Sequence, residues 1–365
     1  MMTSTDTLKY TLQGFDNEIY KQKQSAALQD RISKFSKGRL YLEIGGKFLF
    51  DAHASRVLPG FDPKIKIEIF KGFNVPFDII YCVNAQDIKE NRYIKSDTTP
   101  YADFIDSMIT EYESIIKVKP YISINLINPE NKEAASAYRT KKESEGYKVI
   151  NRYFINGYPD ANSVVTENGY GADEYLQHLN KLVLVVGPAS NSGKMSTCLG
   201  QIYHDKLNGE DSGYAKYETF PIWNLPVNHP INIAYEAATV DIGDFNMVDK
   251  HHLYAYNISA VNYNRDVAAF IIVREIISRI VDKNNFLATY KSPTDMGVNM
   301  AKEAITNDEI VSIASYQEIV RRRDWYYALK GLKPQAQQWG DRCEILLERA
   351  KKYIDTYQYD INLKI

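Results

Sequence analysis

The segment Lys181-Leu-Val-Leu-Val-Val-Gly-Pro-Ala-Ser-Asn-Ser-Gly-Lys-Met-Ser-Thr-Cys198 joins an apolar run to a loop of small residues that ends in Gly-Lys. The pattern predicts a buried strand, a tight loop and the start of a helix. The N–H groups at a helix start point outward with partial positive charge, small residues let the backbone wrap around an anion, and a lysine adds a full charge. We therefore predict a phosphate-binding loop made of Gly187, Ser190, Asn191, Ser192, Gly193, Lys194, Ser196 and Thr197.

The segment departs from the P-loop pattern in two ways. Five residues instead of four separate Gly187 from Gly193, and Met195 stands where the pattern has the hydroxyl that holds Mg²⁺. Ser196 and Thr197 follow, about 100° and 200° further around the helix. Two interpretations therefore stay open: a phosphate-binding loop, or a strand-to-helix turn in which small residues serve close packing.

Composition limits the classes of protein to consider. The chain has 365 residues, of which 44% are apolar and 25% charged, enough for two domains or one large α/β domain. A net charge of −2 argues against nucleic acid as the main partner. The three cysteines have no zinc or disulfide spacing, no apolar run approaches the ~20 residues that span a membrane, and the N-terminus is polar. We expect a cytoplasmic protein with no membrane partner.

Strand-like and helix-like segments alternate along the first half of the chain. Strands are predicted at residues 39–44, 77–83, 121–127, 149–155 and 181–186, and helices at 101–116 and 131–145. This alternation predicts an α/β fold with a Rossmann-like, mostly parallel sheet. Ligands of such sheets bind beyond the carboxyl ends of the strands, where both Gly45-Gly46-Lys47 and the loop at 187–194 are expected.

The second half has a different character. Residues 213–230 are rich in proline and aromatic residues, which favours a rigid excursion over the sheet or a lid. Helices are predicted at 233–239, 266–281, 300–323 and 334–357. We therefore expect a Rossmann-like domain at residues 1–232 and a mainly helical subdomain at 233–365, whose helices form a homo-oligomer surface.

Several polar clusters are candidates for further ligand contacts. Asp241 and Asp244 would lie one turn apart and hold a divalent metal ion if the preceding helix continues; a solvated acidic helix end is the alternative. Arg265 suits phosphate or carboxylate recognition, and Asn264 or Asp266 would cap the helix that follows.

Two further groups are ambiguous. The loop around Asp295 fits a structural turn as well as a site. His53 and Arg56 lie at positions i and i+3 of a short helix, where they would bind an anion or form a surface pair. Arg321-Arg322-Arg323 is interpreted as a solvated helix end.

Several strings resemble a bacterial family known only as domain-of-unknown-function family 1846. They include Leu42-Glu-Ile-Gly-Gly-Lys47, His53-Ala-Ser-Arg-Val-Leu-Pro-Gly-Phe61, Gly213-Tyr-Ala-Lys-Tyr-Glu-Thr-Phe-Pro-Ile-Trp-Asn-Leu-Pro226 and Val261-Asn-Tyr-Asn-Arg-Asp266. The resemblance runs from about residue 38 to about 323. It implies a Rossmann-like N-terminal domain and assigns no activity. Family members are typically longer, with a further C-terminal α/β lobe, and residues 324–365 resemble a helical replacement for it.

The leading hypothesis is an enzyme that acts on a nucleotide or another phosphorylated small molecule, by phosphoryl or nucleotidyl transfer. Lys194, Asp241 and Arg265 are the predicted catalytic residues, with ATP or another nucleotide and Mg²⁺ as cofactors. The predicted substrate-binding residues are Gly45, Gly46, Lys47, His53, Arg56, Asn264 and Asp295. The alternatives are a nucleotide-binding sensor or scaffold without turnover, and a protein that binds NAD or ADP-ribose at Gly45-Gly46.

Overall fold

A seven-stranded parallel sheet forms the centre of the protein. The computed structural model describes residues 10–45, 47–73, 75–93, 99–188 and 191–365. The strands lie in the order β4-β3-β2-β5-β1-β6-β9, and every neighbouring pair is parallel. They are β1 (Leu40–Ile44), β2 (Phe77–Asn84), β3 (Tyr121–Ile127), β4 (Val149–Tyr153), β5 (Leu182–Val186), β6 (Gly213–Tyr217) and β9 (Gly297–Val298).

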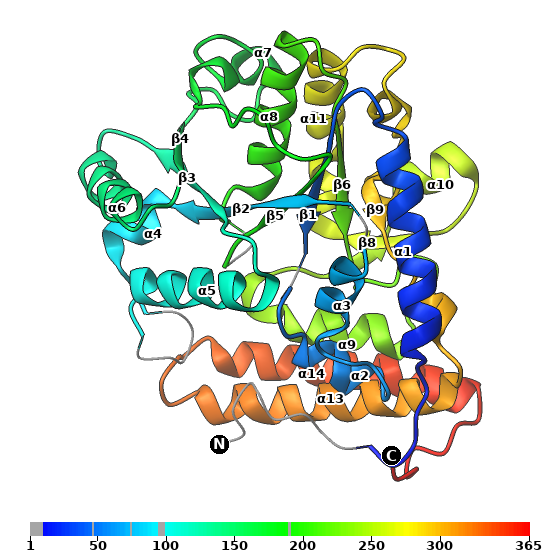
Figure 1. Ribbon diagram of the computed structural model, residues 1–365. Coiled ribbons are helices and arrows are strands. Elements are labelled where there is room, and N and C mark those ends of the chain that lie inside the picture. Colours follow the sequence, from blue (N-terminus) through cyan, green and yellow to red (C-terminus); the bar gives the residue numbers. More distant parts are fainter. Residues whose placement is uncertain (1–9, 46, 74, 94–98, 189–190) are drawn as a thin grey trace.

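Helices cover both faces of this sheet (Figure 1). On one face lie α3 (Ile65–Lys71) and α5 (Tyr101–Ile116), whose Phe70 and Tyr112 rings pack against Tyr217 of β6 and Tyr81 of β2. The other face carries α8 (Lys194–Leu207) and α11 (Asn264–Ile280). All five residues of β5 are buried, as expected of a parallel strand covered on both sides.

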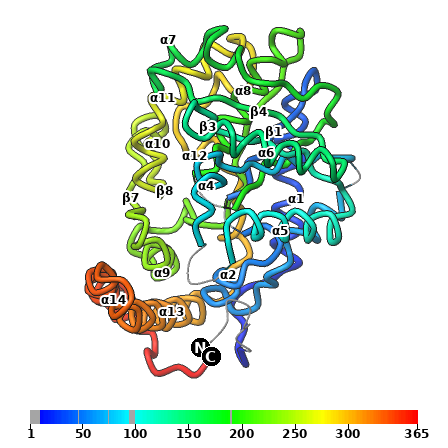
Figure 2. The backbone as a smooth tube through the Cα atoms, turned by 90° about the vertical axis from the view of Figure 1, so that its left-hand side faces the viewer, coloured from blue at the N-terminus to red at the C-terminus, as the bar shows by residue number. Residues whose placement is uncertain are grey.

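A layer of helices lies beyond the carboxyl ends of β1 and β6 (Figures 1 and 2). It consists of α2 (Ala52–Val57), α9 (Pro230–Ala238), α13 (Asp308–Leu329) and α14 (Ala336–Thr356). Strand β1 leads into α2 and strand β6 into α9, so this layer faces the edge of the sheet where parallel folds bind ligands.

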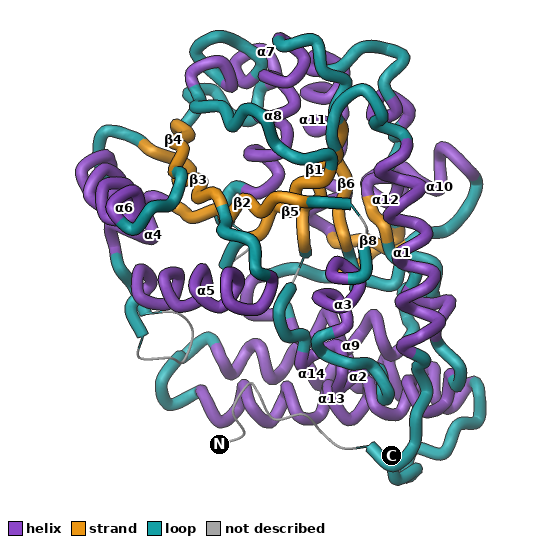
Figure 3. Tube along the Cα trace, viewed as in Figure 1, coloured by secondary structure: helices purple, strands orange, loops and turns teal. Residues whose placement is uncertain are grey.

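The remaining elements are peripheral, and Figure 3 shows helices and loops surrounding the strands. The helices are α1 (Asn17–Ser33), α4 (Ala85–Glu90), α6 (Lys132–Ser144), α7 (Ala161–Val164), α10 (Lys250–Tyr256) and α12 (Pro293–Met296). Short 3₁₀ turns are η1 (Tyr170–Ala172), η2 (Val240–Ile242), η3 (Phe286–Thr289) and η4 (Ala301–Ala304). Strands β7 (Asn246–Val248) and β8 (Val261–Tyr263) form a separate antiparallel pair.

The α/β class and the parallel sheet are confirmed, with each of the five predicted strands present. Two strands of this sheet were missed, as was the separate pair β7 and β8. Residues 213–217 are not part of the proline-rich excursion but form β6, and residues 297–298, expected in a loop, form β9 at the sheet edge. The domain boundary at residue 232 stays a prediction, and β9 from the second half of the chain pairs with β6.

The helix before Asp241 does not continue as the metal hypothesis required. Helix α9 ends at Ala238, a 3₁₀ turn follows, and Gly243 takes the left-handed conformation at φ 75°. Asp241 and Asp244 are therefore not one turn apart on a single helix. In the part of the chain that is described, no helix is long and apolar enough to cross a membrane.

Candidate functional site

Strand order places the loop after β5 at the centre of the sheet's carboxyl edge. Strand β5 lies between β2 and β1, although both precede it in sequence. The loop therefore emerges between Asn84, the last residue of β2, and Gly45, which follows β1. In α/β sheets, ligands bind at the carboxyl edge where the connections of two neighbouring strands run to opposite sides.

Two asparagines on neighbouring strands fix the end of this loop. Asn84 of β2 donates from Nδ2 to the carbonyl oxygen of Asn191 (3.2 Å), and Asn125 of β3 donates to that of Ser192 (2.7 Å). The two asparagines are register partners in the sheet. Because the loop carbonyls turn toward the sheet, the chain enters α8 in one defined orientation.

Both predicted glycines are required by close packing. Gly193 has a φ of 83°, and a Cβ there would lie 2.9 Å from Nδ2 of Asn125. A Cβ on Gly187 would meet Oγ of Ser192 and lie 2.9 Å from the carbonyl oxygen of Cys82. Gly193 is also the N-cap of α8 and has no side chain with which to cap the helix. The helix start therefore lacks the side-chain oxygen that most often occupies that place.

The hydroxyls after Lys194 are engaged within the protein. Thr197 is fully buried, and its Oγ1 lies 3.0 Å from the carbonyl oxygen of Gly193 and 3.2 Å from Oδ1 of Asn125. Arg152 donates from Nη2 to the carbonyl oxygen of Ser196 (2.8 Å) and lies 3.5 Å from the Ser196 hydroxyl. Lys194 is 8% exposed. The phosphate-binding set stays a prediction, and its member Ser190 lies outside the described residues.

A cluster of charged side chains lies beside the loop, on the face of the sheet that α8 covers. Lys216 of β6 pairs with Asp266 in the first turn of α11 at 2.8 Å. Glu43 of β1 is the register partner of Lys216 and accepts a hydrogen bond from the Tyr214 hydroxyl (2.7 Å). Glu218, two residues after Lys216, completes the cluster.

The cluster contains a carboxyl group that holds its proton at neutral pH. Burial, together with the carboxylates of Asp266 and Glu43, raises the pKa of Glu218 to about 8, although Lys216 opposes the shift. Burial lowers the pKa of Lys216, but the same carboxylates more than offset this and raise it above its ordinary value. A neutral carboxylic acid beside an ammonium group can donate or accept a proton in a reaction near pH 7.

Cys198 connects this cluster to the loop. The thiol lies in α8, one turn after Lys194, and burial followed by the charge of Glu43 raises its pKa well above the ordinary value, while Lys194 lowers it. Glu43 and Lys194 therefore both act electrostatically on the same buried group. A fully buried, protonated thiol is not a nucleophile, so Cys198 is not assigned a covalent role.

The predicted metal and arginine residues form other contacts. Arg265 pairs with Asp244 at 3.1 Å, and the Tyr326 hydroxyl donates to Asp241 (3.4 Å). Burial raises the pKa of Asp244, while Arg265 lowers it. Within the described ranges no three His, Cys, Asp or Glu side chains gather to hold a metal ion. Asp241, Asp244 and Arg265 remain predictions as metal and catalytic residues.

Asn264 and Asp295 have structural contacts. Asn264 does not cap α11, whose N-cap is Tyr263; its Oδ1 accepts from the backbone N–H of Phe245 (3.0 Å). Asp295 forms a capping box with Ser292 at the start of α12. At the end of β1, Gly45 donates to the carbonyl oxygen of Tyr217, while Gly46 lies outside the described residues.

The carbonyl oxygen of Lys47, the next of the predicted substrate-binding residues, accepts a hydrogen bond from Lys66.

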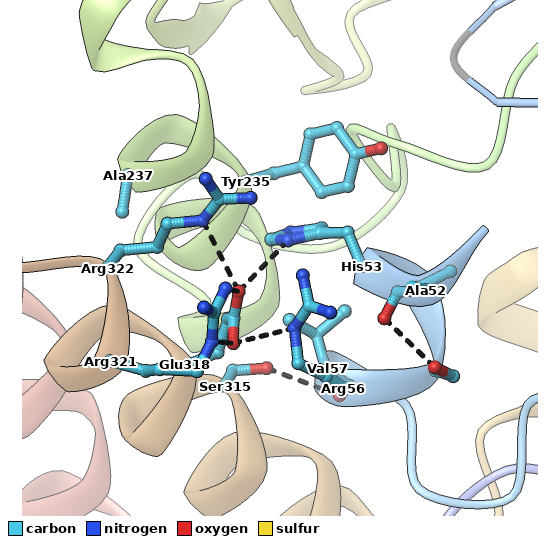
Figure 4. Close-up of polar contacts among 12 residues, drawn as sticks. Ala52, His53, Arg56, Val57, Tyr235, Ala237, Ser315, Glu318, Arg321 and Arg322 are labelled. Atoms are coloured by element: carbon cyan, nitrogen blue, oxygen red, sulfur yellow. Dashed lines mark hydrogen bonds and ion pairs between the residues drawn. The ribbon is translucent and has the colours of Figure 1, made fainter. Parts of the chain in front are cut away.

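His53 and Arg56 meet a buried carboxylate of α13, as Figure 4 shows. The Glu318 side chain is 1% exposed and lies 3.0 Å from Nε of Arg56 and 3.2 Å from Nδ1 of His53. Arg321 and Arg322 bind the same carboxylate, so the interpretation of these two arginines as a solvated helix end was wrong. His53 and Arg56 are far in sequence from Glu318 and its neighbouring arginines, so the sequence analysis did not connect the two groups.

Comparison with known proteins agrees with the resemblance seen in the sequence. The sequence profile of the family described as "Domain of unknown function DUF1846, N-terminal" matches residues 13–351. The chain belongs to this family. The match extends past the quoted strings at both ends and includes most of α14, so that helix is part of the family domain.

Curated relatives come from several bacteria. The chain is 42% identical to a UPF0371 protein of Fusobacterium nucleatum over 85% of this chain and 60% of the relative. It is 39% identical to one of Streptococcus pyogenes over 96% of this chain and 67% of the relative. The chain thus spans about 60 to 67% of the length of these relatives, whose names assign no activity.

Sequence reasoning missed the charged cluster on β6 and the two asparagines. The signal for the cluster was alternation, because Tyr214, Lys216 and Glu218 occupy every second position and therefore one face of a strand. The signal for Asn84 and Asn125 was weaker. Each is a polar residue at the carboxyl end of an apolar strand, which indicates a binding edge only after the strands are paired.

Proposed function

We propose that this DUF1846 domain binds a nucleotide or another phosphorylated small molecule at the loop between β5 and α8 and transfers its phosphoryl or nucleotidyl group. The observation that carries the proposal is the loop itself. It lies at the centre of the carboxyl edge, asparagines fix its carbonyls toward the sheet, and it enters a helix whose N-cap has no side chain.

The chemistry divides between two groups of residues. The backbone N–H groups at the start of α8 and the Lys194 side chain would hold the phosphates and stabilise charge that develops on them. Glu218, with its raised pKa, would exchange a proton with the attacking or leaving group. Asp241 and Asp244 do not share a helix turn, and Arg265 is paired with Asp244, so the proposed transfer assigns none of these three residues to a metal ion.

A thermal-shift panel tests the binding site. Wild type, Lys194→Ala and the control Lys206→Ala are melted with ATP, ADP, NAD, ADP-ribose and sugar phosphates, with and without Mg²⁺. Lys206 lies in the last turn of the same helix, so its substitution controls for lost charge on α8. A ligand that binds the native state raises the melting temperature. We expect a shift in wild type and Lys206→Ala that Lys194→Ala loses; an equal shift in all three proteins would refute the proposal.

The missing hydroxyl after Lys194 favours a second candidate, a nucleotide-binding sensor without turnover. Met195 occupies that position, and Thr197 is buried against Asn125. Phosphorus NMR of bound ATP with Mg²⁺ separates the two. Release of ADP, AMP or pyrophosphate supports transfer, whereas ATP that stays bound and unchanged over hours supports the sensor.

A further inference from the structure

Three arginines surround one buried carboxylate between α2 and α13. Arg321 binds Glu318 through two nitrogens, Nε at 2.5 Å and Nη2 at 2.6 Å, and so forms a bidentate pair. Arg56 lies 3.0 Å from the carboxylate through Nε, and Arg322 lies 3.4 Å away, also through Nε. A single negative charge therefore faces three guanidinium groups.

The neighbouring acidic groups do not balance this charge. Asp51, near Arg56 in sequence, pairs with Lys66 at 2.8 Å. Asp241 accepts a hydrogen bond from Tyr326 and, among the described residues, forms no ion pair with these three arginines. Arg323 turns away from the cluster and pairs with Asp324 and Glu344. Among the described residues, the ion pairs of Arg56, Arg321 and Arg322 all lead to Glu318.

Donor groups remain after Glu318 is satisfied. Within the described part of the chain, the terminal Nη groups of Arg56 and Arg322 have no hydrogen bond to protein, and Arg322 only approaches the Trp325 ring, at 5.6 Å. Among the residues that the structure describes, Nε2 of His53 and Nε of Arg322 are buried without a hydrogen-bond partner. Figure 4 shows Arg56 and Arg322 reaching the carboxylate from opposite sides, with His53 between them.

The electrostatics agree with uncompensated positive charge. Burial, with the charges of Arg321 and Arg322, lowers the pKa of Arg56 even though Glu318 acts to raise it. Burial acts to raise the pKa of Glu318, but Arg321 and His53 hold it well below its ordinary value. The surroundings thus stabilise the ionised form of Glu318 and disfavour the charged form of Arg56.

We propose that Arg56, Arg321 and Arg322 form a second anion-binding site, which takes a phosphate group between α2 and α13. Arginine side chains with unused Nη groups recognise phosphate oxygens through paired hydrogen bonds. The site does not depend on the loop at residues 187–194, since a phosphate can occupy it whether or not a nucleotide binds there. The sequence predicted an anion contact for Arg56. In the proposed site, Arg321 and Arg322 would bind the same anion as Arg56.

Titration of inorganic phosphate by calorimetry, at constant ionic strength, tests the site. All variants of the full chain carry Lys194→Ala as well, so that the loop does not contribute. Arg322→Gln keeps the Arg321–Glu318 pair and removes one donor arm. Glu318→Gln keeps the arginines and removes the carboxylate that competes for them. Arg323→Gln is the matched control, because it removes a neighbouring arginine that pairs elsewhere.

The expected results differ in direction between the variants. Arg322→Gln should weaken phosphate binding by about tenfold or more, the usual effect of losing one charge-assisted hydrogen bond. Glu318→Gln should strengthen binding, and phosphate should raise its melting temperature more than chloride of equal ionic strength does. Arg323→Gln should match the Lys194→Ala parent.

Two outcomes would overturn the proposal. One is phosphate binding that is absent from the parent or unchanged by Arg322→Gln. The other is a Glu318→Gln protein that phosphate stabilises no more than chloride, which would leave the cluster as a structural link between α2 and α13. If Glu318→Gln does not fold, the comparison of Arg322→Gln with Arg323→Gln still decides the matter. Neither outcome bears on nucleotide binding at the loop.

Discussion

Alanine in place of either of two glycines at opposite ends of α8 should have different consequences. Gly193 precedes the helix with φ 83°, and Gly209 follows it with φ 76°. Both positions are left-handed, so an added Cβ costs about 1–2 kcal/mol at each. The space around them differs. A Cβ at Gly193 would lie 2.9–3.0 Å from atoms of Asn125, whereas a Cβ at Gly209 would meet no atom of another described residue within 4 Å beyond its chain neighbours.

Gly193→Ala has a second destabilising effect, because the added Cβ would force the Asn125 side chain to move. Displacing a packed side chain typically costs about 1–3 kcal/mol, and Asn125 also holds the carbonyl of Ser192. We therefore expect Gly193→Ala to lose about 2–5 kcal/mol and Gly209→Ala about 1–2 kcal/mol. Urea unfolding followed by circular dichroism measures both. Equal losses in the two variants would refute the claim that Asn125 closes the space around Gly193.

Two further predictions concern buried charges. Lys66→Met should destabilise the protein by about 3–5 kcal/mol, because it leaves the Asp51 carboxylate buried and unpaired. The control is Lys351→Met, at an exposed position. In the same urea assay it should change stability by less than about 0.5 kcal/mol. A loss for Lys66→Met no larger than that for Lys351→Met would contradict the buried pair. Because the pKa of Glu218 is raised to about 8, the folded chain keeps a proton that the unfolded chain releases, so stability should fall as pH rises toward 8. Glu218→Gln should show a smaller decline between pH 5 and 8, and an unchanged slope would argue against the raised pKa.

The central strands could be predicted because they are short apolar runs that end at turn residues. A parallel strand that is buried on both faces can be predicted from its apolar run alone. Residues 121–127 were predicted with the bounds that the structure has. Strand β6 was missed because Lys216 interrupts its apolar character and prolines follow it. Its lysine is tolerated in the core because Asp266, distant in sequence, pairs with it and because Glu43 and Glu218 lie nearby.

The loop could be located from sequence, but its surroundings could not. Glycine, small residues and lysine after a strand mark a strand-to-helix turn locally. The residues that orient it, Asn84 and Asn125, belong to other strands and become neighbours only through the sheet order. The same holds for Glu318 and Arg56, which are 262 positions apart. The spacing of Glu318 from Arg321 and Arg322 was visible, but the sequence carried no information about what faced them.

A crystal structure with bound ATP and Mg²⁺ would test the proposed binding site most directly. We expect phosphate oxygens within hydrogen-bonding distance of the backbone N–H groups that open α8 and of the Lys194 side chain. A nucleotide bound elsewhere on the sheet edge, with the start of α8 free of phosphate, would contradict it.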